Sequence, residues 1–337
     1  MSRVRSLMIA AGAAALLAGG PALTQQMPDL PPQPPELPPI PPQPEAGSPI
    51  TVYPVRGGLY MVTGPTGNTA VSIGYDGVLV VDPGSADAAK ALLAWIRTKT
   101  SRPVHFIVDT NGDLDHIAAN HAVAMAGELL EGGNTRPEEA VGGTGGAPIW
   151  AHEGVLNRVS AAGGEPTGWP SDTYFVEQKD MFVNGEPVQL LHAPAAHTDG
   201  DSLVFFRRSD VLVTGDVYTP DRYPVIDLEH GGSVNGLIDG LNRILRITVP
   251  EFNEEGGTFV IPGHGRLSDE ADVSEYRDMV TIVRDRIKAM IDKKMSLQQI
   301  QAARPTLDYD VRYGEDAGRT FVEQVYRSLT QKAETRR

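Results

Sequence analysis

The stretch VDTNGDLDHIAANHA, residues 108–122, joins the end of an apolar run to an alanine-rich segment through a short polar motif. The apolar residues 106–108 are typical of a buried strand, and Asp115 and His116 follow where that strand ends. Loops at strand ends are where folds often place functional side chains. An aspartate beside a histidine at such a place predicts metal ligands. Two positions just upstream, where a metal site would want histidines, hold Asn111 and Asp113 instead.

Three more ligand-type residues follow apolar strand runs later in the chain. His197 follows LLHAPAA, Asp216 follows VLVTG and His264 follows FVIPG. Each has an ordinary alternative, because a single histidine is often a surface or packing residue. Asp216 could bond its own backbone in a turn, and Asp115 could cap the next helix. The repetition of one pattern at four strand ends favours a shared site.

The order NGDLDH, AAHTDGD, VTGD and IPGHG resembles the metallo-β-lactamase superfamily, whose hallmark is His-x-His-x-Asp-His, then a histidine, an aspartate in TGD and a histidine in PGHG. The hairpin DGVLVVDPG and the segment IWAHEGV are also similar to that family. The resemblance spans roughly residues 50–290. It implies an α/β (α+β) protein with a four-layer αβ/βα sandwich, in which helices flank two mixed β-sheets.

The resemblance also implies a ligand set for two adjacent metal ions. The second position would use Asp115, His116 and His264, with Asp216 as the bridge between both metals. The first position would use His197 and the residues at 111 and 113.

The departure at residues 111 and 113 changes the expected metal chemistry. Imidazole nitrogen is a good zinc donor, whereas the carboxamide of Asn111 is a poor one and Asp113 offers a harder oxygen. We therefore expect one firmly bound metal, zinc or alternatively manganese or iron, and a second that is weak or absent.

A metal hydrolase is the function that these residues favour. A metal-activated water would attack an ester, lactone, thioester or amide-type bond of a small molecule, with Asp115 or Asp113 as the catalytic proton acceptor. An aspartate at 216 and the lack of cysteine are closer to the glyoxalase-like and lactonase-like branches of the family. The alternatives are β-lactam hydrolysis, a degenerate protein that binds a ligand or partner without turnover, and a di-iron redox protein, which would lack a flavin domain here.

Several residues beyond the ligand set are expected to lie near the site or to support it. Tyr218, Tyr223 and His230 follow Asp216 and are predicted to line the substrate cleft, with loop packing as the alternative. The other histidines are expected to be structural or peripheral: His152 in a packing or capping role, His105 and His192 in strands, His121 at the surface or beside the ligands. The glycine-rich loop 132–146 is a candidate lid.

Composition excludes several classes of function. Lys and Arg number 29 against 43 Asp and Glu, a formal charge of −14, which argues against a nucleic-acid partner. There is no cysteine, so disulfides and thiolate catalysis are excluded.

Three segments are expected along the chain. Residues 1–24, with Arg3 and Arg5 before a short apolar run, are typical of a signal peptide, although an uncleaved anchor helix is an alternative. Residues 25–49 form a proline-rich linker, with eleven prolines from Pro28 to Pro49. Residues 50–337 form the folded domain with a C-terminal helical extension. We therefore expect a periplasmic or secreted protein with no stable membrane span after cleavage; the sequence does not set its oligomeric state.

Local patterns predict the main elements of that domain. A hairpin is expected at 69–84, a strand at 104–109, a turn at Asn184-Gly185 and helices at 85–100, 117–130, 153–162, 233–245, 274–295 and 320–332.

Overall fold

The computed structural model describes residues 48–129, 146–163, 166–249 and 257–331. The predicted signal peptide, nearly all of the predicted linker and the candidate lid loop, apart from Gly146, lie outside the described residues. Among the residues that are described, no helix is both long enough and apolar enough to cross a bilayer.

The first sheet has seven strands in the order β1-β2-β3-β4-β5-β6-β7. The pairs from β1 to β4 are antiparallel, and those from β4 to β7 are parallel. The strands are β1 Thr51–Arg56, β2 Leu59–Thr63, β3 Asn68–Gly74, β4 Gly77–Val81, β5 Val104–Val108, β6 Ile149–His152 and β7 Asp172–Tyr174. The carboxyl ends of the parallel strands meet at one edge of the sheet, where the loops after β4 and β5 begin.

The second sheet has five strands in the order β12-β11-β10-β9-β8. All pairs are antiparallel except β11 with β12. The strands are β8 Gln178–Val183, β9 Glu186–His192, β10 Ser202–Phe206, β11 Val211–Val213 and β12 Phe259–Ile261. Because β11 and β12 run in parallel, the residues that follow them, among them Asp216 and His264, come to the same edge.

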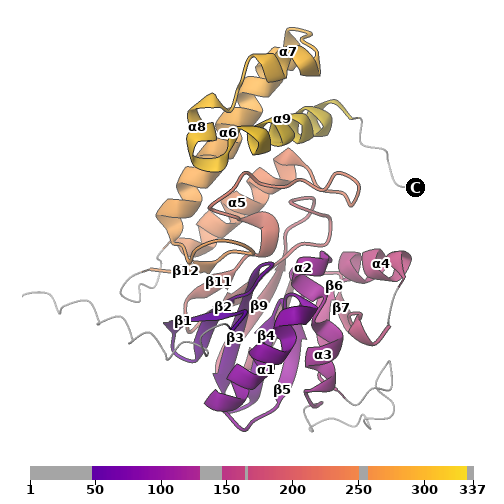
Figure 1. Ribbon diagram of the computed structural model, residues 1–337, viewed down its shortest axis with the longest axis vertical. Coiled ribbons are helices and arrows are strands. Elements are labelled where there is room, and N and C mark those ends of the chain that lie inside the picture. Colours follow the sequence, from indigo (N-terminus) through magenta and orange to yellow (C-terminus); the bar gives the residue numbers. More distant parts are fainter. Residues whose placement is uncertain (1–47, 130–145, 164–165, 250–256, 332–337) are drawn as a thin grey trace, which may run out of the picture. The chain divides into compact units, whose positions relative to one another are not determined.

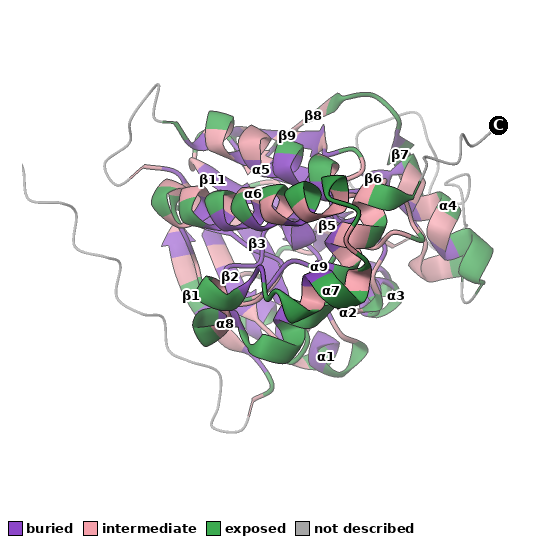
Figure 2. Cartoon of the chain, turned by 90° about the horizontal axis from the view of Figure 1, so that it is seen from above, coloured by how far each residue is buried: buried purple, intermediate pink, exposed green. Residues whose placement is uncertain are grey.

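Apolar side chains pack in three layers: one between the two sheets, and one between each sheet and the helices that cover it. Leu79 and Val108 of the first sheet pack with Leu190 and Val213 of the second in the central layer. Helices α1 (Ala86–Lys99) and α3 (Asn120–Met125) cover the outer face of the first sheet. Helices α5 (Val234–Thr248) and α6 (Glu270–Asp292) cover the second, and Figure 2 shows buried strands beneath helices with exposed outer surfaces. This confirms the predicted αβ/βα sandwich.

The alanine-rich segment differs from its prediction. Instead of one helix over 117–130, the chain forms α2 (Leu114–Ile117) and then α3, with a break at Ala118 and Ala119. The backbone of Gly84 is the reason: its N–H donates to His116 O (2.8 Å) and its carbonyl accepts from Ala119 N (2.9 Å). These bonds replace helical ones and fix the segment to the loop after β4.

The C-terminal extension is helical, as predicted, but contains more elements. Figure 1 shows α7, α8 and α9 gathered against α6. Two short helices, α7 (Leu297–Ala302) and α8 (Leu307–Tyr313), precede α9 (Glu315–Thr330) and were missed. The predicted turn at Asn184-Gly185 is confirmed, with φ of 56° and 79°, the left-handed values of a tight hairpin turn.

Candidate metal centre

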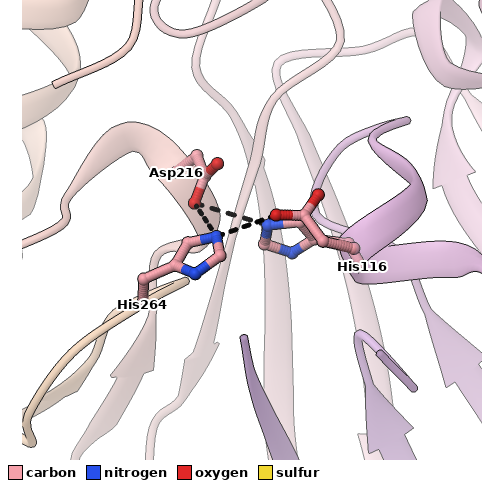
Figure 3. A group of neighbouring side chains, drawn as sticks. His116, Asp216 and His264 are labelled. Atoms are coloured by element: carbon pink, nitrogen blue, oxygen red, sulfur yellow. Dashed lines mark ion pairs between the residues drawn. The ribbon is translucent and has the colours of Figure 1, made fainter. Parts of the chain in front are cut away.

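Four ligand-type side chains meet where the two sheets share an edge. Asp115 and His116 lie on α2, Asp216 on the short 3₁₀ helix η3 (Gly215–Val217) after β11, and His264 after β12. Their ligand atoms all lie within 4.8 Å of one another, and Figure 3 shows His116, Asp216 and His264 converging. We call these four residues the second half of the centre.

The spacing of these atoms fits a bound metal ion. His116 Nε2 and His264 Nε2 each lie 3.3 Å from Asp216 Oδ1, and His264 Nε2 lies 3.1 Å from Asp115 Oδ2. Ligands about 2.0–2.1 Å from a tetrahedral ion are about 3.3 Å apart. His116 Nε2, His264 Nε2 and Asp216 Oδ1 are buried and have no hydrogen-bond partner among the described residues. A shared cation would satisfy all three atoms.

Asp82 orients one of these ligands. Its Oδ2 accepts a hydrogen bond from His116 Nδ1 (2.9 Å), so Nε2 keeps its lone pair for the centre. Thr110 donates to Asp82 through its backbone N–H (2.7 Å) and its hydroxyl (2.6 Å). The sequence interpretation missed this role, although Asp82 stands in the DGVLVVDPG segment that it singled out.

Backbone contacts hold the loop that carries His264. Asn68, at the start of β3, donates from its side-chain Nδ2 to the backbone carbonyls of Pro262 (3.0 Å) and Gly265 (2.9 Å). A Cβ at Gly263 would lie 2.3 Å from Asp216 Oδ1, so a side chain there would displace the ligand. The glycine before His264 therefore makes room for Asp216.

The charge around the second half is strongly negative. Burial alone would raise the pKa of Asp216, but the imidazoles of His116, His197 and His264 outweigh it and hold the pKa well below its usual range. Burial would lower the pKa of His116, yet Asp82 and Asp216 raise it well above its usual value. Between these two carboxylates His116 holds a second proton on Nε2 when no metal is bound, and a metal ion at Nε2 would replace that proton.

The first half of the centre, Asp113 and His197 beside the shared Asp216, is arranged differently. These three could also present ligand atoms within 4.8 Å of one another. However, His197 Nε2 lies 2.7 Å from Asp113 Oδ2 in a direct hydrogen bond, while its Nδ1 bonds Val225 O at 3.0 Å. The other Asp113 oxygen accepts from the Arg158 guanidinium.

Asn111 does not supply a ligand in place of histidine. Its side chain is buried, and its Oδ1 accepts the backbone N–H of Asp113 at 2.8 Å. Burial would raise the pKa of Asp113, but His197 and Arg158 lower it to about 2. Burial would lower the pKa of His197, but Asp113, Asp201 and Asp216 raise it to about 10. The first half is thus an ion-paired network.

Two predicted substrate-lining residues lie elsewhere. Tyr218 is buried and donates from its hydroxyl to Ser268 Oγ at 3.1 Å. Tyr223 is buried and donates to Thr306 O and Asp310 Oδ1, against Phe321 of α9. Their prediction as cleft residues is wrong, because the C-terminal helices cover them.

His230 stays closer to its predicted place. Its side chain is 40% exposed and its Nδ1 lies 2.6 Å from Asp227 Oδ2. It lines a cavity of about 860 Å³ together with Arg158, His121, Trp169, Leu114 and Ile117. Gly112 and Leu114, on either side of Asp113 in the chain, also line this cavity, which places it beside the first half.

Two histidines outside the centre and one of its ligands have clear packing or helix-end positions. His152 caps α4 (Glu153–Ala162) by accepting Gly154 N–H at Nδ1 (3.2 Å), and its ring stacks on His192 at 3.7 Å, as expected. His105 bonds Glu128 O from β5. Asp115 is not a cap, because it lies inside α2, where Asp113 holds the N-cap position.

Comparison with known proteins agrees with this fold. A sequence model of the metallo-beta-lactamase superfamily matches residues 62–264, more than half of the chain. No curated protein matches the sequence.

Solved structures of low sequence identity share the fold. The stereoselective inverting sec-alkylsulfatase Pisa1 from Pseudomonas sp. matches with a TM-score of 0.65 at 14% identity, over 83% of this chain and 50% of that one. This chain thus spans half the length of that sulfatase. A metallo-beta-lactamase from Pontibacter korlensis matches with a TM-score of 0.54 at 15% identity, over 69% of this chain and 99% of the other. The DIM-1 metallo-beta-lactamase matches with a TM-score of 0.53 at 16% identity, over 69% and 97%.

Proposed function

Because this chain belongs to the metallo-β-lactamase superfamily, we propose that it is an exported metal-dependent hydrolase of small molecules. The observation that carries the proposal is a trio of buried atoms, His116 Nε2, His264 Nε2 and Asp216 Oδ1, for which the described part of the chain offers no hydrogen-bond partner. A relic without function has no physical reason to keep three such atoms aimed at one point, since each unsatisfied buried polar atom costs free energy. This favours catalysis over the alternative of ligand binding without turnover.

Asp115, His116, Asp216 and His264 would hold the metal. The chemistry that a divalent ion would supply there is a lowered pKa of water and polarisation of the bond that is to be broken. Asp82 keeps His116 in the tautomer that presents Nε2. Asp115, whose side chain is 35% exposed, would accept the proton that the attacking water gives up.

Asp113 is a weaker candidate for the base than Asp115. Its two carboxylate oxygens already bond Arg158 and His197, and its pKa falls to about 2. Burial would raise the pKa of Asp115, but His264 and His116 lower it too, so the difference lies in the contacts: among the described residues the Asp115 carboxylate has one ion pair, with His264, where that of Asp113 has two. We therefore assign proton transfer to Asp115 alone.

The cavity beside the first half would take the part of the substrate that does not react. Its volume of about 860 Å³ lies within the roughly 300–1,000 Å³ of typical small-molecule sites. Trp169, Leu114 and Ile117 offer apolar contact, and His230 and Arg158 offer polar contact. Esters, lactones, thioesters and amides are the proposed substrate classes. The sulfatase and lactamase likenesses add sulfate esters and β-lactams to the compounds worth testing.

Export rests on the composition of the first residues. A basic start, a short apolar run and small residues before position 25 support a cleaved signal, and therefore a periplasmic or secreted enzyme.

The test is elemental analysis of the mature domain purified without chelator, with the Asp115→Ala/His116→Ala double variant beside it. We expect about one metal ion per chain in the parent protein and none in the double variant. His121→Ala is the matched control, because it removes a histidine of the same segment outside the ligand set, and it should keep the metal. A parent protein that takes up no zinc, manganese or iron would refute the proposal. A metal-loaded parent would then be screened against the substrate classes above.

A further inference from the structure

We propose that the guanidinium of Arg158 takes the electrostatic place of the first metal ion, so that the centre pairs one metal with one fixed side-chain cation. This inference rests on the proposed metal-dependent function. It goes further because it assigns a role to a residue from outside the predicted ligand motifs.

The contacts of Arg158 place its charge at the first half. The residue lies on α4, and its Nη2 contacts Asp113 Oδ1 and lies 3.4 Å from Asp227 Oδ2. The side chain is 20% exposed, so the ion pair with Asp113 is largely shielded from solvent. A shielded arginine–carboxylate pair is held more firmly than a surface pair. Asp113, one of the three candidate ligands of the first position, is thus already neutralised.

The spacing of the remaining ligand atoms agrees with this assignment. His197 Nε2 and Asp113 Oδ2 are 2.7 Å apart, a hydrogen-bond distance. Two ligands of one tetrahedral ion would stand about 3.3 Å apart. In the second half, the ion-paired ligand atoms stand 3.1 to 3.3 Å apart, which is close to that spacing. The first half has therefore closed on itself, with Arg158 in contact with the carboxylate.

The chemistry of arginine lets its side chain supply a permanent positive charge in the place of a metal ion. A guanidinium does not lose its proton in proteins, so its charge is permanent and independent of metal supply. Its Nη1 is buried and has no hydrogen-bond partner among the described residues. An unsatisfied donor beside Asp113 is consistent with a group held in place for its charge.

Removal of Arg158 should open the first position to metal. Asp113, His197 and Asp216 would then offer three ligands, which is enough for an ion that keeps one open position. The experiment measures zinc per chain by elemental analysis after equilibration with excess zinc and removal of unbound ions. The variants are Arg158→Ala and Arg158→Gln, the second of which keeps length and hydrogen bonding without the charge. Arg243→Ala is the matched control, because Arg243 is also 20% exposed but bonds the carbonyl of His192.

We expect one zinc per chain in the parent protein and in Arg243→Ala, and a rise to about two in both Arg158 variants. Circular dichroism and thermal unfolding identify a variant that has lost its fold, and Arg158→Gln then decides the question. Folded Arg158 variants that stay at one zinc would overturn the inference and leave the proposed function intact, as would a parent protein with two tightly held zinc ions. A parent protein with no zinc would overturn both.

Discussion

The two halves of the centre share Asp216 but differ in how their ligand-type residues meet. In the second half, the ligand atoms stand 3.1 to 3.3 Å apart, and three of them are buried without a hydrogen bond to any residue that the structure describes. In the first half, Asp113 and His197 bond each other at 2.7 Å, and Arg158 completes the charge balance. The same residue types thus build an ion site in one place and an ion-paired network a few ångströms away. Spacing and the presence of a competing cation decide between the two outcomes.

The histidines of the two halves are held alike, so orientation does not explain the difference. Nδ1 of His116 bonds Asp82, and Nδ1 of His197 bonds the carbonyl of Val225. Both arrangements direct Nε2 toward the centre. What differs is the distance from Nε2 to the carboxylate oxygen that it faces: 3.3 Å to Asp216 Oδ1 for His116, and 2.7 Å to Asp113 Oδ2 for His197.

The largest difference should appear between two single variants, each of which removes one histidine from one half. His116→Ala deletes a direct ligand of the second half, so its metal affinity should fall by more than about 100-fold, beyond the 10–100-fold of outer partners. His197→Ala should change the same affinity by less than about 10-fold, because its Nε2 is committed to Asp113. Competition with a chromogenic chelator measures both affinities.

Equal losses in the two alanine variants would break the comparison, since His197 would then bind the same ion as His116. Thermal unfolding of both metal-free variants serves as the control. Each should still unfold cooperatively, so that a lost affinity reflects a lost ligand.

Asp82→Asn sharpens the comparison at the next level. The variant keeps the shape of the side chain but removes the charge that holds His116 Nδ1–H, so the metal affinity of the second half should fall roughly 10–100-fold. Hydrolytic activity should recover at high metal concentration, because the direct ligands remain. A titration of activity against metal concentration should show a midpoint at higher metal concentration than in the parent protein. An unchanged midpoint would mean that Asp82 does not support metal binding through His116.

Sequence reasoning could find the second half because its ligands lie in short local motifs at strand ends. Asp115, His116, Asp216 and His264 each follow an apolar run, and the parallel pairs β4-β5 and β11-β12 bring such strand ends to common edges. The sandwich followed from the resemblance of these motifs to the metallo-β-lactamase superfamily, because the alternation of strands and helices does not by itself choose that architecture.

The supporting residues could not be predicted because they act across long separations in the sequence. Arg158 lies 45 residues from Asp113, and Asn68 reaches Pro262 across 194 residues. Neither follows a strand end, and arginine in a helix is usually a solvated residue. The prediction that Tyr218 and Tyr223 line the cleft was wrong for the converse reason. They are close to Asp216 in the sequence, but the C-terminal helices bury them.

The first half should also reveal itself through pH. In the metal-free protein, the pKa of Asp113 is about 2, below its unfolded value of 3.8, so its stabilisation is present above pH 3.8 and is lost as pH falls toward 2. The pKa of His197 is about 10, above 6.5, so its stabilisation is complete below pH 6.5 and is lost as pH rises through 10. Asp113→Asn should therefore destabilise the metal-free protein most between about pH 4 and 6.5, by up to about 2 kcal/mol.

Denaturant unfolding of both metal-free proteins at several pH values measures this difference. A difference in unfolding free energy that stays constant from pH 4 to 10 would mean that Asp113 and His197 do not form a charged pair. Asp180→Asn, on the exposed face of β8, is the control and should show no such window.

The smallest effect on the metal centre should come from α4, the helix that presents Arg158. His152 caps α4 by accepting the backbone N–H of Gly154, and a lost cap typically costs about 1 kcal/mol. His152→Ala should therefore lower the unfolding free energy by at least that amount, because its buried ring also stacks on His192, while zinc binding stays at one ion per chain. Because His152 is outside both halves, only a loosened α4 could connect it to the metal. A rise in stoichiometry in this variant would mean that the position of α4 alone holds Arg158 against Asp113, and it would tie the difference between the halves to one helix cap.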